Sequence, residues 1–304
     1  MSPSKNKIWL VAFIITIGVG LATTFLLLPE TLIAPETEKE KPTPRETATT
    51  TTPVFREARN VIGKSIEGRV IESYTFGTGT DNLLFVGGIH GGYEWNSTIL
   101  AYEFIDALEA GTISVPANLT ITVIPTLNPD GLFAVVKKEG RFTTEEIRPN
   151  DTYTAGVGRF NSNNVDLNRN FDCKWQRTST WKGKTVAAGT SPFSEPEAIA
   201  LRDLVNKISP QVVVFWHSQA NTVYASECME GVLPQTKVVM DAYAKAAQYK
   251  SVESFDAYPI SGDAEGWLAS IGIPAITVEL ETRTSPEWER NKNGIEALLK
   301  LYSK

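Results

Sequence analysis

The chain has 304 residues, of which 42% are hydrophobic and 21% are charged, and its formal net charge is −6. This composition excludes a disordered protein, a collagen and a small disulfide-stapled scaffold. The acidic balance argues against nucleic acid as a partner, because phosphate binding needs a concentrated basic surface and no cluster of lysine and arginine occurs. The chain has only two cysteines and two histidines, so each of these residues is a functional candidate.

Residues 1–28 predict a transmembrane anchor. The uncharged stretch 8–28 would span about 30 Å as a helix, which is the thickness of a bilayer's hydrocarbon core. Lys5 and Lys7 precede it, so the positive-inside rule places the rest of the chain outside the cytoplasm. The alternative is a cleaved signal peptide and a secreted protein. Residues 29–54 are rich in threonine and proline and predict an extended linker.

Residues 55–304 predict a single catalytic domain in which short apolar runs alternate with amphipathic stretches. The apolar runs typical of buried strands are 83–86, 119–124, 212–216 and 275–278. The predicted helices are 98–108, 196–207, 235–247 and a last one from Ser285 to about Tyr302. Residues 194–197 have the sequence of a capping box for the second of these helices. This alternation predicts an α/β fold with helices on both faces of the sheet.

Both histidines and one glutamate lie where predicted strands end. His90 follows the first strand, His217 comes directly after the third, and Glu279 closes the fourth. The ligand crevice of an α/β sheet lies at the carboxyl ends of its strands, so parallel neighbouring strands would bring these side chains together. The alternative for each histidine is an ordinary polar residue with satisfied hydrogen bonds.

The loop after His90 predicts a metal site. Its sequence is His-Gly-Gly-Tyr-Glu, so Glu94 lies four residues after His90. A histidine and a nearby carboxylate, completed by a distant histidine, form the ligand set of a catalytic zinc with an open water position. The predicted ligands of one Zn²⁺ per chain are therefore His90, Glu94 and His217.

Seven short motifs occur in a fixed order along the domain. They are GGIHGGYE at 87–94, NPDG at 128–131, VDLNRNF at 165–171, PFSEPE at 192–197, WHS at 216–218, YPISG at 258–262 and TVEL at 277–280. In this order they resemble the zinc carboxypeptidases of the carboxypeptidase A type, especially the bacterial branch that trims cell-wall peptides. The resemblance implies a mixed, mostly parallel central sheet flanked by helices. The family has two residues between the histidine and glutamate of its first motif, whereas this chain has three.

The resemblance implies a role for each matched residue. His90, Glu94 and His217 correspond to the zinc ligands. Glu279 corresponds to the general base that takes a proton from the attacking water and passes it to the leaving amine. Glu281, two residues further on the same strand face, is the alternative for this role.

The same resemblance implies how substrate is bound. Asn168 and Arg169 correspond to the pair that binds the terminal carboxylate of the substrate. Tyr258 corresponds to a mobile tyrosine that closes over the substrate. Glu265 corresponds to the floor of the pocket for the terminal side chain, where a carboxylate would select Lys, Arg or diaminopimelate. The alternative is that Glu265 lies on a solvated loop.

Two further roles are implied near the metal. Asp166 corresponds to the acid that accepts a hydrogen bond from a zinc-binding imidazole. Arg159 corresponds to the arginine that stabilises the oxyanion, and Arg148 and Arg141 are the alternatives.

Cys173 follows the Asn-Arg pair and Cys228 follows His217, so both cysteines are expected near the site. In an exported domain they can form a disulfide, and two free buried thiols are the alternative.

Together these features predict a membrane-tethered, extracytoplasmic zinc carboxypeptidase acting on peptides, including the peptides of peptidoglycan. One alternative is a zinc amidase or deacylase of the same fold that acts on N-acyl amino acids. Another is a non-catalytic binding module that retains a relict site.

Overall fold

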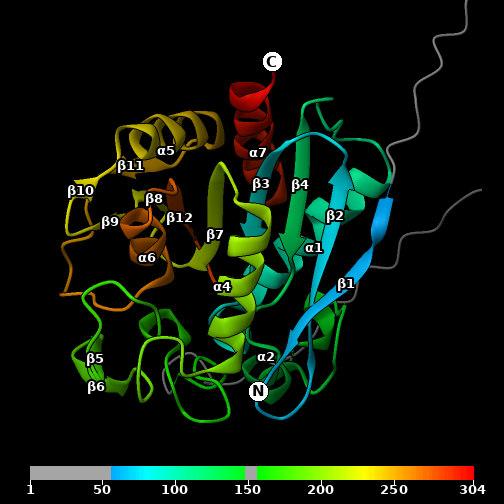
Figure 1. The fold of residues 1–304 in the computed structure, drawn as a ribbon. Helices are drawn as coiled ribbons and strands as arrows, with labels where there is room; N and C mark the ends of the chain where they lie inside the picture. The colour runs from blue at the N-terminus through cyan, green and yellow to red at the C-terminus, as the bar shows by residue number, and fades with distance from the viewer. Residues whose placement is uncertain (1–55, 148–155) are drawn as a thin grey trace, which may run out of the picture. The chain divides into compact units, whose positions relative to one another are not determined.

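A computed structural model describes residues 56–147 and 156–304 of the chain (Figure 1). The predicted anchor, the predicted linker and Arg148 lie outside the described residues. Within the described ranges, no helix combines the length and the hydropathy needed to cross a bilayer.

A mixed eight-stranded sheet forms the centre of the part of the chain that the structure describes. Its strands are β1 (Arg56–Lys64), β2 (Val70–Gly77), β3 (Asp81–Val86), β4 (Leu119–Ile124), β7 (Val212–Ser218), β8 (Thr222–Ala225), β11 (Lys250–Val252) and β12 (Ala275–Leu280). They lie in the order β1-β2-β4-β3-β7-β12-β8-β11. The middle strands β4, β3, β7 and β12 pair in parallel, whereas β1, β2 and β8 add antiparallel pairs. The strands predicted from the sequence are these four parallel strands.

Helices and short turns connect the strands. They are η1 (Gly91–Glu94), α1 (Trp95–Glu109), α2 (Pro129–Val136), η2 (Thr144–Glu146), η3 (Leu167–Arg169), α4 (Pro196–Ile208), α5 (Pro234–Ala247), α6 (Ala264–Ser270) and α7 (Trp288–Tyr302). Two small sheets join β5 (Thr178–Trp181) to β6 (Lys184–Ala187) and β9 (Glu227–Cys228) to β10 (Gly231–Val232).

The four predicted helices are present as α1, α4, α5 and α7, but the predicted capping box is wrong. Glu195 is the N-cap of α4, and it makes no side-chain capping bond. The Ser194 hydroxyl instead donates to the Glu195 carboxylate and accepts from the Asn170 amide. The serine therefore joins α4 to the loop at Asn170 rather than capping the helix.

Helices lie on both sides of the middle strands (Figure 1), and the side chains on both faces are buried. Leu83 and Phe85 of β3 belong to the core that includes residues of α1, α5 and α7. Leu84 and Val86 belong to the opposite core, which includes residues of α4 and α6. This alternation explains why the strands read as continuous apolar runs, since successive side chains point to opposite faces.

The same alternation determines where the polar residues at the strand ends point. Val213 and Phe215 face the α4/α6 side, and His217 continues this row on β7. Ala275 of β12 lies in the same core, so Glu279 follows on that face. The parallel register of β12 and β7 pairs Glu279 directly with His217.

Candidate metal centre and active site

The turn η1 brings Glu94 back beside His90. The Nδ1 atom of His90 lies 3.1 Å from Oε1 of Glu94. Gly91 has a φ of 44°, and a Cβ atom there would lie 2.7 Å from the backbone carbonyl carbon of Gly131 in α2. Only glycine fits this left-handed, closely packed position, so the glycines accommodate the longer spacing between His90 and Glu94.

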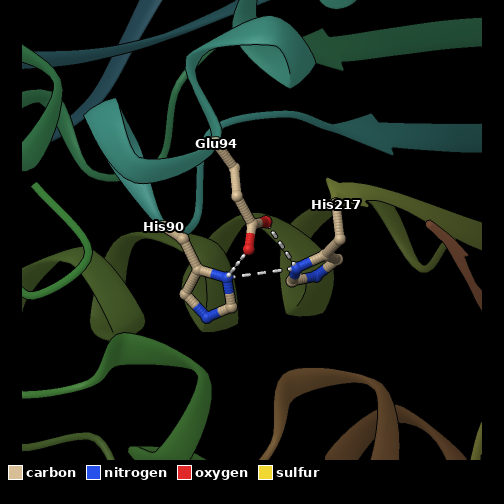
Figure 2. A group of neighbouring side chains, drawn as sticks. All are labelled: His90, Glu94 and His217. Atoms are coloured by element: carbon tan, nitrogen blue, oxygen red, sulfur yellow. Dashed lines mark hydrogen bonds and ion pairs between the residues drawn. The ribbon is translucent and has the colours of Figure 1, made fainter. Parts of the chain in front are cut away.

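His217 completes a buried group of three side chains (Figure 2). Its Nδ1 atom lies 3.1 Å from Oε2 of Glu94 and 3.2 Å from Nδ1 of His90. Ligand atoms bound about 2.0–2.1 Å from a tetrahedral zinc lie about 3.3 Å apart, so the three residues fit this ion. They are the group that can bind a metal within the described ranges.

The electrostatic environment of this group favours a cation. Burial alone would raise the pKa of Glu94, but His90 and His217 outweigh it and keep the pKa well below its usual value. Burial alone would lower the pKa of His217, but hydrogen bonds to Glu265 and Glu94 raise it to about 10. A positive charge is therefore stabilised here, either on an imidazolium or on a metal ion bound by neutral imidazoles.

Asp166 and Arg159 lie behind His90. Asp166 Oδ1 is 3.4 Å from Nε2 of His90, and Arg159 donates to Asp166 Oδ2 from Nε at 2.9 Å. Burial would raise the pKa of Asp166, but Arg159 and His90 lower it far below its usual value. Arg159 is 3% exposed and its guanidinium stacks 4.7 Å from the centroid of Trp181. The ionised Asp166 thus orients Arg159 and lies close to His90, whose Nε2 atom has no hydrogen-bond partner among the described residues.

Glu265 occupies the corresponding place behind His217. It lies in the first turn of α6, is 4% exposed, and accepts a hydrogen bond from His217 Nε2 at 3.0 Å. Thr277 Oγ1 donates to the same oxygen at 3.1 Å. The alternative of a solvated loop is therefore wrong. Glu265 lines the cavity as well, next to Asp263, the N-cap of α6.

A cavity of about 400 Å³ opens beside the three candidate ligands, and Glu279 lines it. Glu279 Oε2 is buried and has no hydrogen-bond partner among the described residues. Burial, followed by the charge of Glu94, raises the pKa of Glu279 to about 7. Glu281, the alternative base, lies beyond β12, is 58% exposed and pairs with Arg290 outside the cavity.

Like Glu265, the other three residues predicted to bind substrate line the same cavity. Asn168 Oδ1 accepts from the backbone N–H of Ala264, so the start of α6 fixes the amide. Arg169 is 2% exposed and donates to the carbonyls of Asn168 and Thr180. Its Nε atom has no partner among the described residues, so the guanidinium retains capacity for an anion. Tyr258 is half-buried, with its ring 4.9 Å from the ring of Phe255.

The structure also shows where the two cysteines and Arg141 lie. Cys173 and Cys228 are joined by a disulfide, and Cys173 lines the cavity. Arg141 pairs with Asp106 and lies outside the cavity, so it does not compete with Arg159.

Sequence analysis did not single out five charged residues that line the cavity: Lys174, Lys182, Glu227, Asp263 and Arg283. Arg283 follows β12 by a few residues, so its position after the carboxyl end of a buried strand was a usable signal. Lys182 is at the turn of the β5–β6 hairpin, for which the sequence offered no comparable pattern.

Removal of the Glu265 carboxylate should weaken zinc binding. In Glu265→Ala, His217 loses the acceptor that fixes its Nε2–H, and loss of such a partner typically weakens metal affinity by roughly 10- to 100-fold. Glu265→Gln keeps an amide oxygen as acceptor and is the matched control, with a smaller loss expected. Chelator competition and elemental analysis measure zinc binding in the two variants. His217→Ala should lose the metal, and a wild-type dissociation constant in Glu265→Ala would contradict the positioning role.

Known proteins are similar in sequence to this chain. The zinc carboxypeptidase family matches residues 56–294. Gamma-D-glutamyl-L-diamino acid endopeptidase 1 of Lysinibacillus sphaericus is 25% identical over 247 residues, which cover 74% of this chain and 61% of that protein. Murein peptide amidase A of Escherichia coli (strain K12) is 30% identical over 139 residues, or 42% of this chain and 54% of that protein. The chain thus spans between 54% and 61% of the length of these relatives.

Solved structures with the same fold include two from distant organisms. Murein-tripeptide amidase from Escherichia coli O157 has a TM-score of 0.55 and 22% identity, over 81% of this chain and 92% of that chain. Bovine thrombin-activatable fibrinolysis inhibitor, in complex with tick carboxypeptidase inhibitor, has a TM-score of 0.62 and 20% identity, over 80% of this chain and 87% of that chain. These likenesses concern the fold, and the match over residues 56–294 identifies the family. The chain belongs to the zinc carboxypeptidase family.

Proposed function

We propose that this chain is a zinc-dependent peptidase that removes the C-terminal residue from peptides. The observation that carries the proposal is the placement of Glu279. This half-buried residue, whose Oε2 atom is buried, is paired in register with His217 and lines the cavity beside the three candidate zinc ligands. A cation site, an adjacent base and an anion-binding arginine in one cavity are the parts that peptide hydrolysis at a free carboxyl terminus requires.

The residues would act as follows. A bound zinc lowers the pKa of water and polarises a carbonyl. Glu279 takes the proton of the attacking water and delivers it to the leaving amine. Arg159, oriented by Asp166, donates to the developing oxyanion. Asn168 and Arg169 bind the terminal carboxylate, which places the cut one residue from the end.

The charge of the terminal pocket supports a substrate with a basic last residue. Asp263 and Glu265 both line the cavity, and burial, followed by the charge of Glu265, raises the pKa of Asp263 to about 6. Glu265 already accepts from His217, so an ammonium or guanidinium group in the pocket would pair with Asp263. The names of two relatives, a diamino acid endopeptidase and a murein peptide amidase, support cell-wall peptides as the substrate class.

A zinc amidase that acts on N-acyl amino acids is the second candidate, because one relative is named an amidase. It would use the same metal ligands and Glu279. Mass spectrometry of the products from a peptide with a free carboxyl terminus and from an N-acyl amino acid separates the two activities.

Glu279→Gln should bind zinc normally and lose turnover by about 100-fold or more, since the amide keeps the shape but accepts no proton. In the wild type, kcat/KM should rise with pH through the pKa of Glu279, because only the ionised carboxylate acts as a base. The charge of a bound metal lowers this pKa, so the acidic limb should lie below the value of about 7 given by burial and Glu94. Near-normal turnover in Glu279→Gln would refute the mechanism.

Peptides that differ only in the last residue should be hydrolysed faster with Lys, Arg or diaminopimelate than with Phe or Leu. Asp263→Asn should reduce this preference by about tenfold, the typical effect of losing one charged hydrogen bond. Asparagine still caps α6 through its side-chain oxygen, so the helix is preserved. Glu265→Ala is a poorer test, because Glu265 also contacts His217. A clear preference for terminal Phe or Leu would exclude the basic pocket.

We also propose that residues 8–28 anchor the catalytic domain to the outer side of the membrane. The protein should sediment with membranes, and detergent rather than high salt should release it. A mature protein that begins after Leu28 and occurs free in the medium would indicate cleavage and secretion instead.

A further inference from the structure

The guanidinium of Arg159 is held along one edge by Asp166. Its Nε and Nη2 atoms lie 2.9 Å and 2.8 Å from the same oxygen, Oδ2 of Asp166. Bonds that converge on one oxygen hold a guanidinium less firmly than a fork that uses both carboxylate oxygens, because the group can still tilt about that oxygen. The remaining terminal nitrogen, Nη1, lies 3.8 Å from Oε1 of Glu94, on the side of the candidate metal ligands. Asp166 alone therefore leaves the direction of Nη1 incompletely fixed.

The indole of Trp181 covers the face of the same guanidinium. Cζ of Arg159 lies 4.7 Å from the centroid of the Trp181 ring, and Trp181 is buried at the wall of the cavity. A Cβ atom at Gly156 would lie 2.6 Å from the indole, so the turn that precedes Arg159 packs against this ring as well. A ring on the face opposes the tilt that bonds along one edge allow, and cation–π attraction favours this position of the guanidinium.

The edge support and the face support of Arg159 are bonded to each other. Trp181 ends β5, and the backbone N–H of Asp166 donates to the carbonyl of Ala187, the last residue of β6, at 2.9 Å. On its other side, the indole meets the ring of Tyr93 edge to face, with the ring centroids 5.3 Å apart. The β5–β6 hairpin therefore holds Trp181 in a fixed position relative to Asp166.

We propose that Trp181 is a positioning residue that keeps the Arg159 guanidinium directed at the developing oxyanion. This inference rests on the proposed function, in which Arg159 donates to that oxyanion. Such a donor lowers the barrier most when it already points to the place where charge develops, and it adds little to the binding of the uncharged substrate carbonyl. In this role Trp181 acts through Arg159 and makes no bond to the reacting atoms.

Trp181→Leu keeps a buried apolar side chain and removes the aromatic face. It should lower kcat by about 10- to 100-fold, the typical effect of a misplaced or lost oxyanion donor. KM and zinc content should change little, because the metal ligands and the carboxylate-binding pair remain in place. Trp181→Phe keeps an aromatic face and should retain more of the rate. Steady-state kinetics of zinc-loaded protein on one peptide with a free carboxyl terminus measure kcat and KM.

A double-mutant cycle with Arg159→Met separates positioning from packing. Once Arg159→Met has removed the guanidinium, Trp181→Leu should lower kcat no further, because Trp181 then has no group to position. The matched control is Val186→Ala, since Val186 packs in the same small core as Trp181 and its loss leaves the indole present. This control should keep kcat close to that of the wild type. Trp181→Phe takes the place of Trp181→Leu in the cycle if the leucine variant does not fold.

Unchanged kcat in Trp181→Leu would overturn the inference, as would an equal loss of kcat with and without the Arg159 side chain. Failure of the proposed function gives a different result, because zinc-loaded wild type and Val186→Ala then cleave no peptide. In that case crystal structures of zinc-loaded wild type and Trp181→Leu decide whether the indole holds the guanidinium. A displaced Arg159 guanidinium in the variant would support this positioning, and an unchanged one would overturn it.

Discussion

Burial of both faces of the middle strands is the constraint on which the site depends. Helices cover β3, β7 and β12 on each side, so an ionisable side chain inside these strands would be taken out of water without a partner. Such side chains are tolerated where the strands end and the cavity begins. Parallel pairing puts those ends at one edge of the sheet, and the register of β7 with β12 sets His217 opposite Glu279.

The carboxylates at this edge of the sheet differ in whether a cationic group is bonded to them, and this difference distinguishes their roles. Glu94 lies between two imidazoles, Asp166 is bound by Arg159, and Glu265 accepts from His217. Glu279 has no such partner for its buried oxygen, and burial, followed by the charge of Glu94, raises its pKa. The carboxylates that are neutralised can orient cations, and the one that is not can exchange a proton near neutral pH.

The features predictable from the sequence are those with a strong local pattern. Continuous apolar runs identified β3, β4, β7 and β12, and the alternation of strands with helices identified the α/β class. The ordered motifs indicated the family before any geometry was known. The two histidines and Glu94 were candidates because each follows a buried strand or its loop.

The features that could not be predicted depend on contacts between distant segments. Ser194 had a capping-box sequence, yet Asn170, far from it along the chain, competes for its hydroxyl. Glu265 was assigned to a pocket floor or a solvated loop, but its bond to His217 needs the docking of α6 beside β7. Lys182 and Arg283 likewise reach the cavity from the β5–β6 hairpin and from the segment after β12, which no local pattern connects.

The disulfide between Cys173 and Cys228 has an effect outside the folded state as well. It joins residues separated by 55 positions, and the closed loop begins shortly after the Asn-Arg pair and ends in β9. By the chain-entropy relation, closing a loop of this length removes about 4 kcal/mol of conformational entropy from the unfolded chain. The enclosed segment includes His217 but not His90 or Glu279. An unfolded chain that keeps this bond therefore starts refolding with His217 inside the closed loop. The other two candidate ligands, His90 and Glu94, lie outside the loop and must reach His217 during folding.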